Sequence, residues 1–169
     1  MIQIQGPKEA ATLGRVFPRR RHAYGCKVSG ERACCGRPVR PDIAALADGR
    51  HVVAGTKFDF PTDRAGRSIR AGFFNADGSA FRPEFQVSTT TTDDQKHAGI
   101  TALADGGSVV TWSDCNLPSH DPFPSAIRAQ IFSADGLPSG RVFVVKTTTD
   151  GWQTDPTVGT LADGRSVVT

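Results

Sequence analysis

The chain has 169 residues, of which 22% are charged and 38% are hydrophobic, and its formal net charge is +3. This length is enough to bury a real core, and no apolar run approaches the roughly 18 residues of a membrane span. The basic residues are concentrated before Pro41 and the rest of the chain is near neutral. It therefore lacks the basic stripe interleaved with aromatic residues that indicates nucleic-acid binding.

The first forty residues fit the pattern of the rest poorly. The sequence Gly14–Phe17 recurs as Gly140–Phe143, so we interpret residues 2–17 as a decayed third and fourth strand of a repeat. Residues 18–40 then form an irregular insertion with basic residues and cysteines, for which a solvated loop is favoured over contact with an acidic partner. The N-terminus lacks the charged-then-apolar pattern of a signal peptide, so an export signal would have to lie outside this chain.

The cysteines do not define a framework. They are Cys26, Cys34, Cys35 and Cys115. Their number and spacing do not match a disulfide scaffold, and no C-x2-C pair indicates zinc. We expect unpaired thiols.

From Pro41 onward the sequence is repetitive. The tripeptide Ala-Asp-Gly occurs five times, beginning at Ala47, Ala76, Ala104, Ala134 and Ala162. Two types of copy alternate, so the true period is about 58 residues. An Asp-Gly pair favours a hairpin turn, because Gly accepts positive φ and the Asp carboxylate caps nearby backbone N–H groups. Each period therefore predicts two hairpins, or four strands.

The strand patterns predict stacked sheets. In the third strand Ile69, Ala71 and Phe73 share one face, and paired valines in the second strand indicate a strand covered on both faces. We predict an all-β fold, a β-propeller-like array of four-stranded antiparallel blades, with a solenoid or a string of sandwiches as alternatives. Its repeats are residues 41–97, 98–155 and a truncated copy at 156–169. Because blades bury their faces against neighbours, we expect an incomplete array, a fragment of a longer one.

A family resemblance rests on these motifs. The segments Leu103–Trp112 and Ile127–Phe132, followed by Val145 with its Thr run, resemble the repeats of very large secreted bacterial proteins. Those proteins often also carry hemolysin-type (RTX) calcium-binding repeats or cadherin-like adhesin modules. The resemblance covers residues 41–169 and implies no defined activity. The calcium nonapeptide is absent and Gly55 stands where the next copy has Trp112, so a calcium-loaded β-roll is not predicted.

Residues that recur in every copy are interpreted as architectural, because one reaction centre does not need a copy in each blade. The turn aspartates are Asp48, Asp77, Asp105, Asp135 and Asp163. They lack the Asp-x-Asp-x-Asp-Gly spacing of a calcium loop. We expect Arg70 and Arg128 to pair across the blade, and Trp112 and Trp152 to serve packing. The Thr runs 89–92 and 147–149 suit strand ends or connections.

A functional site would be expected in the non-repeated loops between second and third strands. We predict these loops at residues 56–68, with Asp59 and Asp63, and at residues 113–126, with Asp114, Cys115, His120 and Asp121. Asp114, His120 and Asp121 are the densest group of metal or acid–base residues, but no second element supports them. His22, His51 and His97 are scattered. We therefore assign no catalytic, cofactor-binding or metal residue.

Three functions remain open from the sequence. The leading hypothesis is a non-catalytic repeat module, a scaffold or adhesion surface of a larger secreted or cell-surface bacterial protein, because all the strong signal is repeated architecture. Its expected partners are neighbouring repeats of a longer chain, with a glycan or cell-surface protein as a further ligand, and no nucleic acid or membrane span. The alternatives are a sialidase-like propeller glycan hydrolase and a calcium-stabilised surface module. No cofactor is predicted beyond the calcium of that last alternative.

Overall fold

The computed structural model describes residues 39–58, 66–89, 94–115, 125–145 and 153–169. These residues form ten β-strands in three sheets, and every strand pairs antiparallel with its neighbour in the chain. The prediction of an all-β fold with four-stranded antiparallel sheets is therefore confirmed. The described residues contain no helix that is long and apolar enough to cross a membrane.

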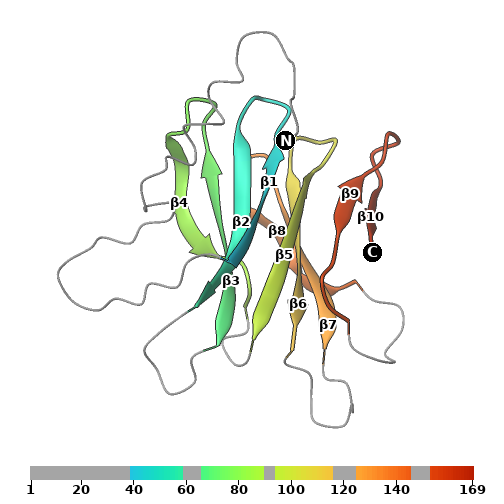
Figure 1. Ribbon diagram of the computed structural model, residues 1–169. Coiled ribbons are helices and arrows are strands. Elements are labelled where there is room, and N and C mark those ends of the chain that lie inside the picture. Colours follow the sequence, from blue (N-terminus) through green and yellow to red (C-terminus); the bar gives the residue numbers. More distant parts are fainter. Residues whose placement is uncertain (1–38, 59–65, 90–93, 116–124, 146–152) are drawn as a thin grey trace, which may run out of the picture.

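The sheets follow one another along the chain. Blade one consists of β1 (Val39–Ala45), β2 (His51–Phe58), β3 (Arg67–Phe74) and β4 (Ala80–Gln86). Blade two consists of β5 (Gln95–Ala102), β6 (Ser108–Asp114), β7 (Ala126–Phe132) and β8 (Pro138–Val144). Blade three is the hairpin of β9 (Val158–Thr160) and β10 (Ser166–Val168). Figure 1 shows the three side by side, in cyan to green, yellow to orange, and red.

The first hairpin has the same register in each blade. Ile43 pairs with Val53, Ile100 with Val110, and Val158 with Val168. Because a shift of one residue would exchange the two faces of a strand, this shared register places equivalent side chains on equivalent faces. The blades are therefore structural repeats as well as sequence repeats, and positions about 58 residues apart can be compared directly.

The predicted Asp-Gly turns are present. The glycines are at positive φ, between 71° and 87°, at Gly49, Gly78, Gly106, Gly136 and Gly164. In four of these turns the Asp carboxylate accepts the N–H two residues later, with Asp48, Asp77, Asp105 and Asp163 bonded at 2.8–3.0 Å. In the fifth turn the Ser133 hydroxyl accepts the Leu137 N–H at 3.3 Å. The predicted capping role is thus confirmed for four of the five aspartates.

The core lies between blades one and two. Ile69, Ala71 and Phe73, which the alternation of β3 placed on one face, are all fully buried. Phe132 of β7 lies against Phe73 and against Phe85 of β4, with ring centroids 6.1 and 5.4 Å apart. Aromatic pairs at such separations add to the energy of area burial. The two sheets therefore shield each other's apolar faces, as a propeller-like arrangement requires.

The paired valines are covered on both faces in blades one and two. Val52 and Val53 are 0% and 1% exposed, and Val109 and Val110 are 6% and 0% exposed. The packing role predicted for Trp112 is confirmed, because its side chain is 1% exposed in the core cluster. Trp152 lies outside the described residues.

Some predicted boundaries differ from the structure. The second strands run further than predicted, because β2 continues to Phe58 and β6 to Asp114, into the segments predicted as loops. The strand β1 begins at Val39, before the predicted start of the array at residue 41. The stretch 1–38 lies outside the described residues, as do the runs of threonine at 90–92 and 147–149. The three sheets stack without closing into a ring in the part of the chain that the structure describes.

Candidate functional site

The first strands of blades one and two carry a bulge at the same place in the repeat. The pairing of β1 with β2 shifts between Val39 and Asp42, and the pairing of β5 with β6 shifts between Lys96 and Gly99. A β-bulge bends its strand and turns a side chain away from the regular alternation, and bulges are frequent next to functional sites. The side chains at and around these bulges, together with the neighbouring start of blade three, are called here the rim; they are Asp42, Asp94, His97 and Asp155.

His97 and Asp155 occupy the same repeat position at the rim of blades two and three. Both have a left-handed backbone, with φ of 58° and 55°, a conformation that costs a residue with a side chain about 1 kcal/mol or more. The His97 Nδ1 atom lies 3.1 Å from the Asp155 Oδ1 atom, with 28% and 54% of the side chains exposed. The rim thus holds an imidazole–carboxylate pair that joins two blades, with the histidine half-buried and the aspartate exposed.

Buried serines fix the backbone beneath this pair. The Asp155 N–H donates to the Ser113 hydroxyl at 3.1 Å, and the Gln153 N–H donates to the Ser125 hydroxyl at 2.7 Å. Both serines are 0% exposed. Hydrogen bonds to buried hydroxyl groups are not exchanged for water, so these two bonds help to hold the backbone on either side of Asp155 in place.

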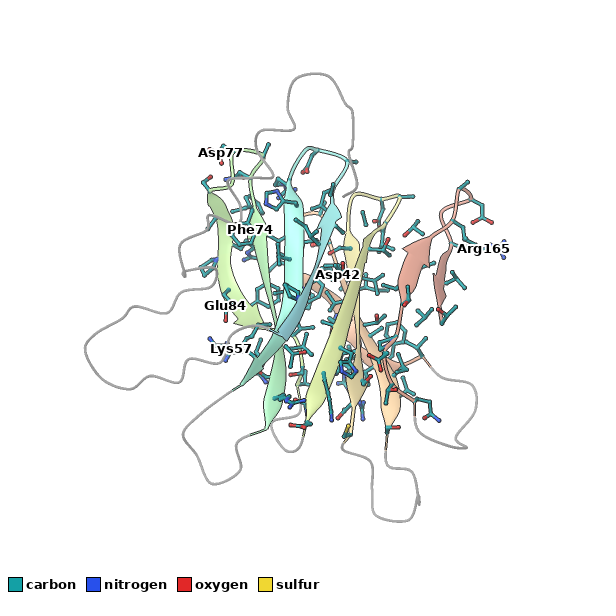
Figure 2. The ribbon with its side chains drawn as sticks, in the orientation of Figure 1. Asp42, Lys57, Phe74, Asp77, Glu84 and Arg165 are labelled. Carbon is teal, nitrogen blue, oxygen red and sulfur yellow. The ribbon has the colours of Figure 1, made fainter. Side chains whose placement is uncertain are left out.

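Asp42 fastens blade one to blade two. Its Oδ1 atom accepts the Ile43 N–H and its Oδ2 atom accepts the Ile100 N–H, both at 2.9 Å. Figure 2 shows Asp42 near the centre of the view, between the first strands of the two blades. Both oxygens of this carboxylate are therefore engaged by backbone amides.

Asp94 makes a second contact between the same blades. Its Oδ1 atom accepts the Arg67 N–H at 3.2 Å, and its Oδ2 atom lies 3.4 Å from Lys96 Nζ and 4.0 Å from Arg67 Nη1. Its carbonyl oxygen also accepts the Cys115 N–H at 3.1 Å. These side chains are 28–39% exposed, so the ion pairs are screened by solvent and the backbone bonds define the geometry.

Asp114 does not lie in a loop, although the sequence predicted it there. Asp114 is the last residue of β6, and its side chain is 0% exposed and ion-paired with Arg128 of β7. The predicted pairing of Arg128 across the blade is confirmed, and a buried ion pair of this kind is a structural contact. Its two predicted companions, His120 and Asp121, lie outside the described residues, as do Asp59 and Asp63. Arg70, the equivalent of Arg128, is half-buried on β3.

The chemistry open to the rim is limited by these contacts. A histidine whose Nδ1 atom faces a carboxylate still has its Nε2 atom for hydrogen bonding. No group of three or more His, Cys, Asp or Glu side chains within the described ranges could hold a metal ion. The rim therefore offers polar groups that can form hydrogen bonds with a ligand.

Sequence reasoning missed the rim pair. His97 looked isolated in the sequence. However, His97 directly precedes Ala98 and Asp155 directly precedes Pro156, and Ala98 and Pro156 are equivalent positions 58 residues apart. A comparison of the two copies position by position, including the residues that differ, would have placed these two side chains at equivalent positions near the start of adjacent blades. The ion pair itself depends on how closely the blades pack, which the spacing does not specify.

Comparisons with known proteins give little. No family model matches the chain, and no curated protein matches it. Among solved structures, the chain is similar to an endo-arabinase from Bacteroides thetaiotaomicron, with 14% identity and a TM-score of 0.48. The match covers 76% of this chain and 49% of that one, so this chain spans about half the length of the endo-arabinase. At this identity and TM-score the likeness supports no argument about activity.

Proposed function

We propose that this chain is a non-catalytic repeat module, a scaffold or adhesion surface of a larger secreted or cell-surface bacterial protein. One observation carries the proposal: six aspartates of the described blades accept hydrogen bonds from backbone amides. Asp42 and Asp94 accept amides that join blades one and two, and Asp48, Asp77, Asp105 and Asp163 cap hairpin turns. A glycosidase-type reaction needs a pair of carboxyl groups available to the substrate.

Three of the turn aspartates have a pKa below the usual value, which favours their anionic form. The Arg50 side chain lowers the pKa of Asp48, the Ser79 side chain lowers the pKa of Asp77, and the Arg165 backbone N–H lowers the pKa of Asp163. A general acid needs the opposite shift, toward the working pH. This supports a structural role for the repeated aspartates.

Ligand contact is best placed at the rim. The half-buried His97 and the exposed Asp155 offer polar groups near the start of adjacent blades. Polar groups on a rigid sheet suit the hydroxyl groups of a glycan or the main chain of a surface protein. The backbone strain at both residues is consistent with a retained role, since such strain is concentrated at functional sites.

The test is a glycan array probed with the full chain and with His97→Asn and Asp155→Asn. Asparagine tolerates the left-handed conformation, so these variants remove the imidazole–carboxylate contact while keeping the backbone. Asp135→Asn, an exposed turn residue whose carboxylate does not cap the turn, is the matched control. We expect binding that both rim variants weaken about tenfold and the control leaves unchanged. Absence of any ligand would remove the adhesion role and leave the scaffold role.

Two further assays separate the alternatives. Release of reducing sugar from polysaccharides by the wild-type chain would replace this proposal with the propeller glycan hydrolase. A melting temperature that rises with calcium and falls with chelator would favour the calcium-stabilised module, because a ligand that binds the folded state stabilises it.

A further inference from the structure

The outward face of the β9–β10 hairpin carries exposed apolar side chains. This face, called here the open face, consists of Leu161, Arg165 and Val167. Leu161 and Val167 are 43% and 46% exposed. An apolar sheet face normally packs against another layer.

The same positions are covered in blade one. Leu46, the equivalent of Leu161, is 5% exposed, and Val52, the equivalent of Val167, is 0% exposed. Both belong to the core cluster formed with blade two. Blade one therefore shows what happens to this face when a neighbouring blade is present: the equivalent side chains are buried.

In blade one the arginine on this face contacts the neighbouring blade. Arg50 bonds to its own turn through Asp48 Oδ2 at 2.6 Å, and its Nη2 atom donates to the Ala134 carbonyl of blade two at 2.8 Å. Arg165 repeats the first contact, with Nε bonded to Asp163 Oδ2 at 2.7 Å. Its side chain is 78% exposed, compared with 16% for Arg50. Figure 2 shows Arg165 at the edge of the molecule, away from the other blades.

The partner of Arg50 also has an equivalent on this chain. The turn at Ala134–Gly136 corresponds to the turn at Ala76–Gly78 in blade one. Gly136 is buried, because a Cβ there would meet Phe73 at 2.9 Å and Arg82 at 3.1 Å. Ala76 and Asp77 are exposed, and Figure 2 shows Asp77 on the side of the molecule opposite Arg165. The chain therefore presents both halves of a blade-to-blade contact at its two sides.

We propose that the open face binds blade one of a second copy of this chain, with Arg165 donating to the Ala76 carbonyl as Arg50 donates to Ala134. The acidic turn at Asp77 complements the charge of Arg165. Such a contact joins unlike surfaces, so it extends to a closed ring or an open series of copies. The proposal rests on the covered contact between blades one and two and does not depend on the proposed ligand binding.

The first test is light scattering coupled to size exclusion over a concentration series. We expect the mean mass of the wild-type chain to rise with concentration, and Val167→Asp and Arg165→Asp to weaken association at least tenfold. Both residues are exposed, so the melting temperature should hold. Leu137→Asp, which replaces an exposed apolar residue of a blade-two turn, is the matched control and should associate like the wild type. A monomeric wild type, or association that persists in both open-face variants, would overturn the proposal.

A mixing experiment tests the head-to-tail geometry. Asp77→Lys places a cation on the turn that Arg165 should approach, and Val167→Asp disables the open face. Neither variant should associate alone, but each retains one intact half. Their mixture should therefore form a one-to-one pair and stop there. Failure of the mixture to form this pair would refute a contact between unlike faces, as would assemblies larger than two.

Discussion

The contact between Phe85 and Phe132 gives the sharpest test of the stacked blades. Phe132 is 1% exposed and lies 5.4 Å from Phe85 and 6.1 Å from Phe73, both on the other blade. Truncation of a buried Phe to Ala costs about 3–5 kcal/mol, and an aromatic pair adds about 0.5–1.5 kcal/mol of coupling. We expect Phe132→Ala to destabilise the chain by about 3 kcal/mol or more.

The assay is urea unfolding of Phe85→Ala, Phe132→Ala and the double variant, analysed as a double-mutant cycle. The coupling energy across the blades should be about 1 kcal/mol. Phe143 repeats Phe85 in blade two but is 44% exposed, so Phe143→Ala is the internal control and should cost much less. Zero coupling between Phe85 and Phe132, or equal effects of Phe132→Ala and Phe143→Ala, would refute face-to-face packing of the blades.

Three further predictions concern single positions. The buried His51 ring is stacked 5.4 Å from Phe74, and burial lowers the pKa of His51 below the usual 6.5. Below pH 6.5 the unfolded chain binds more protons than the folded chain, so the free energy of unfolding should fall as pH decreases. Denaturant titrations at pH 5 and 7.5 should show a smaller pH dependence for His51→Phe. A Cβ at Gly107 would lie 2.4 Å from the Phe132 carbonyl oxygen, whereas one at Gly159 would meet nothing within 4 Å. Gly107→Ala should therefore destabilise the chain by about 1–3 kcal/mol, and Gly159→Ala should be neutral or stabilise it by about 0.5 kcal/mol. Equal changes in melting temperature would contradict this. Asp105 caps the Gly107 N–H at 2.9 Å, but the turn of Asp135 is capped by Ser133. Asp105→Ala should therefore cost about 1 kcal/mol and Asp135→Ala less than about 0.5 kcal/mol. Equal losses in calorimetry would show that the Asp105 carboxylate does not cap.

The sheets were predictable because their determinants are local. An Asp-Gly pair fixes a turn through the positive φ of glycine, and alternation on β3 fixes which face Ile69 and Phe73 share. Repetition then strengthens each local inference, because the same turn occurs five times. This is why strand number and order followed from the sequence, and why the turn aspartates could be assigned.

The strand ends and the rim were not predictable in the same way. Asp114 was predicted to lie in a loop, but it is the last residue of β6, where Arg128 neutralises its charge within the sheet. His97 and Asp155 take a left-handed backbone that neither residue favours strongly. His97 lies within the bulge of β5, and the backbone around Asp155 is held by bonds to Ser113 and Ser125. Contacts of this kind depend on the packing of distant segments and leave no periodic signal.

The two junctions between blades are fastened by different means, although the blades are repeats. At the first junction Asp42 binds the Ile100 N–H of the next blade. Gly99 occupies the equivalent position at the second junction, where a Cβ would lie 3.1 Å from the Pro156 carbonyl oxygen. An aspartate side chain at position 99 would therefore clash with the backbone at Pro156, which approaches closely because residue 99 is glycine. The shared sequence therefore specifies the blade, and the positions that differ specify which blade it can accept as a neighbour.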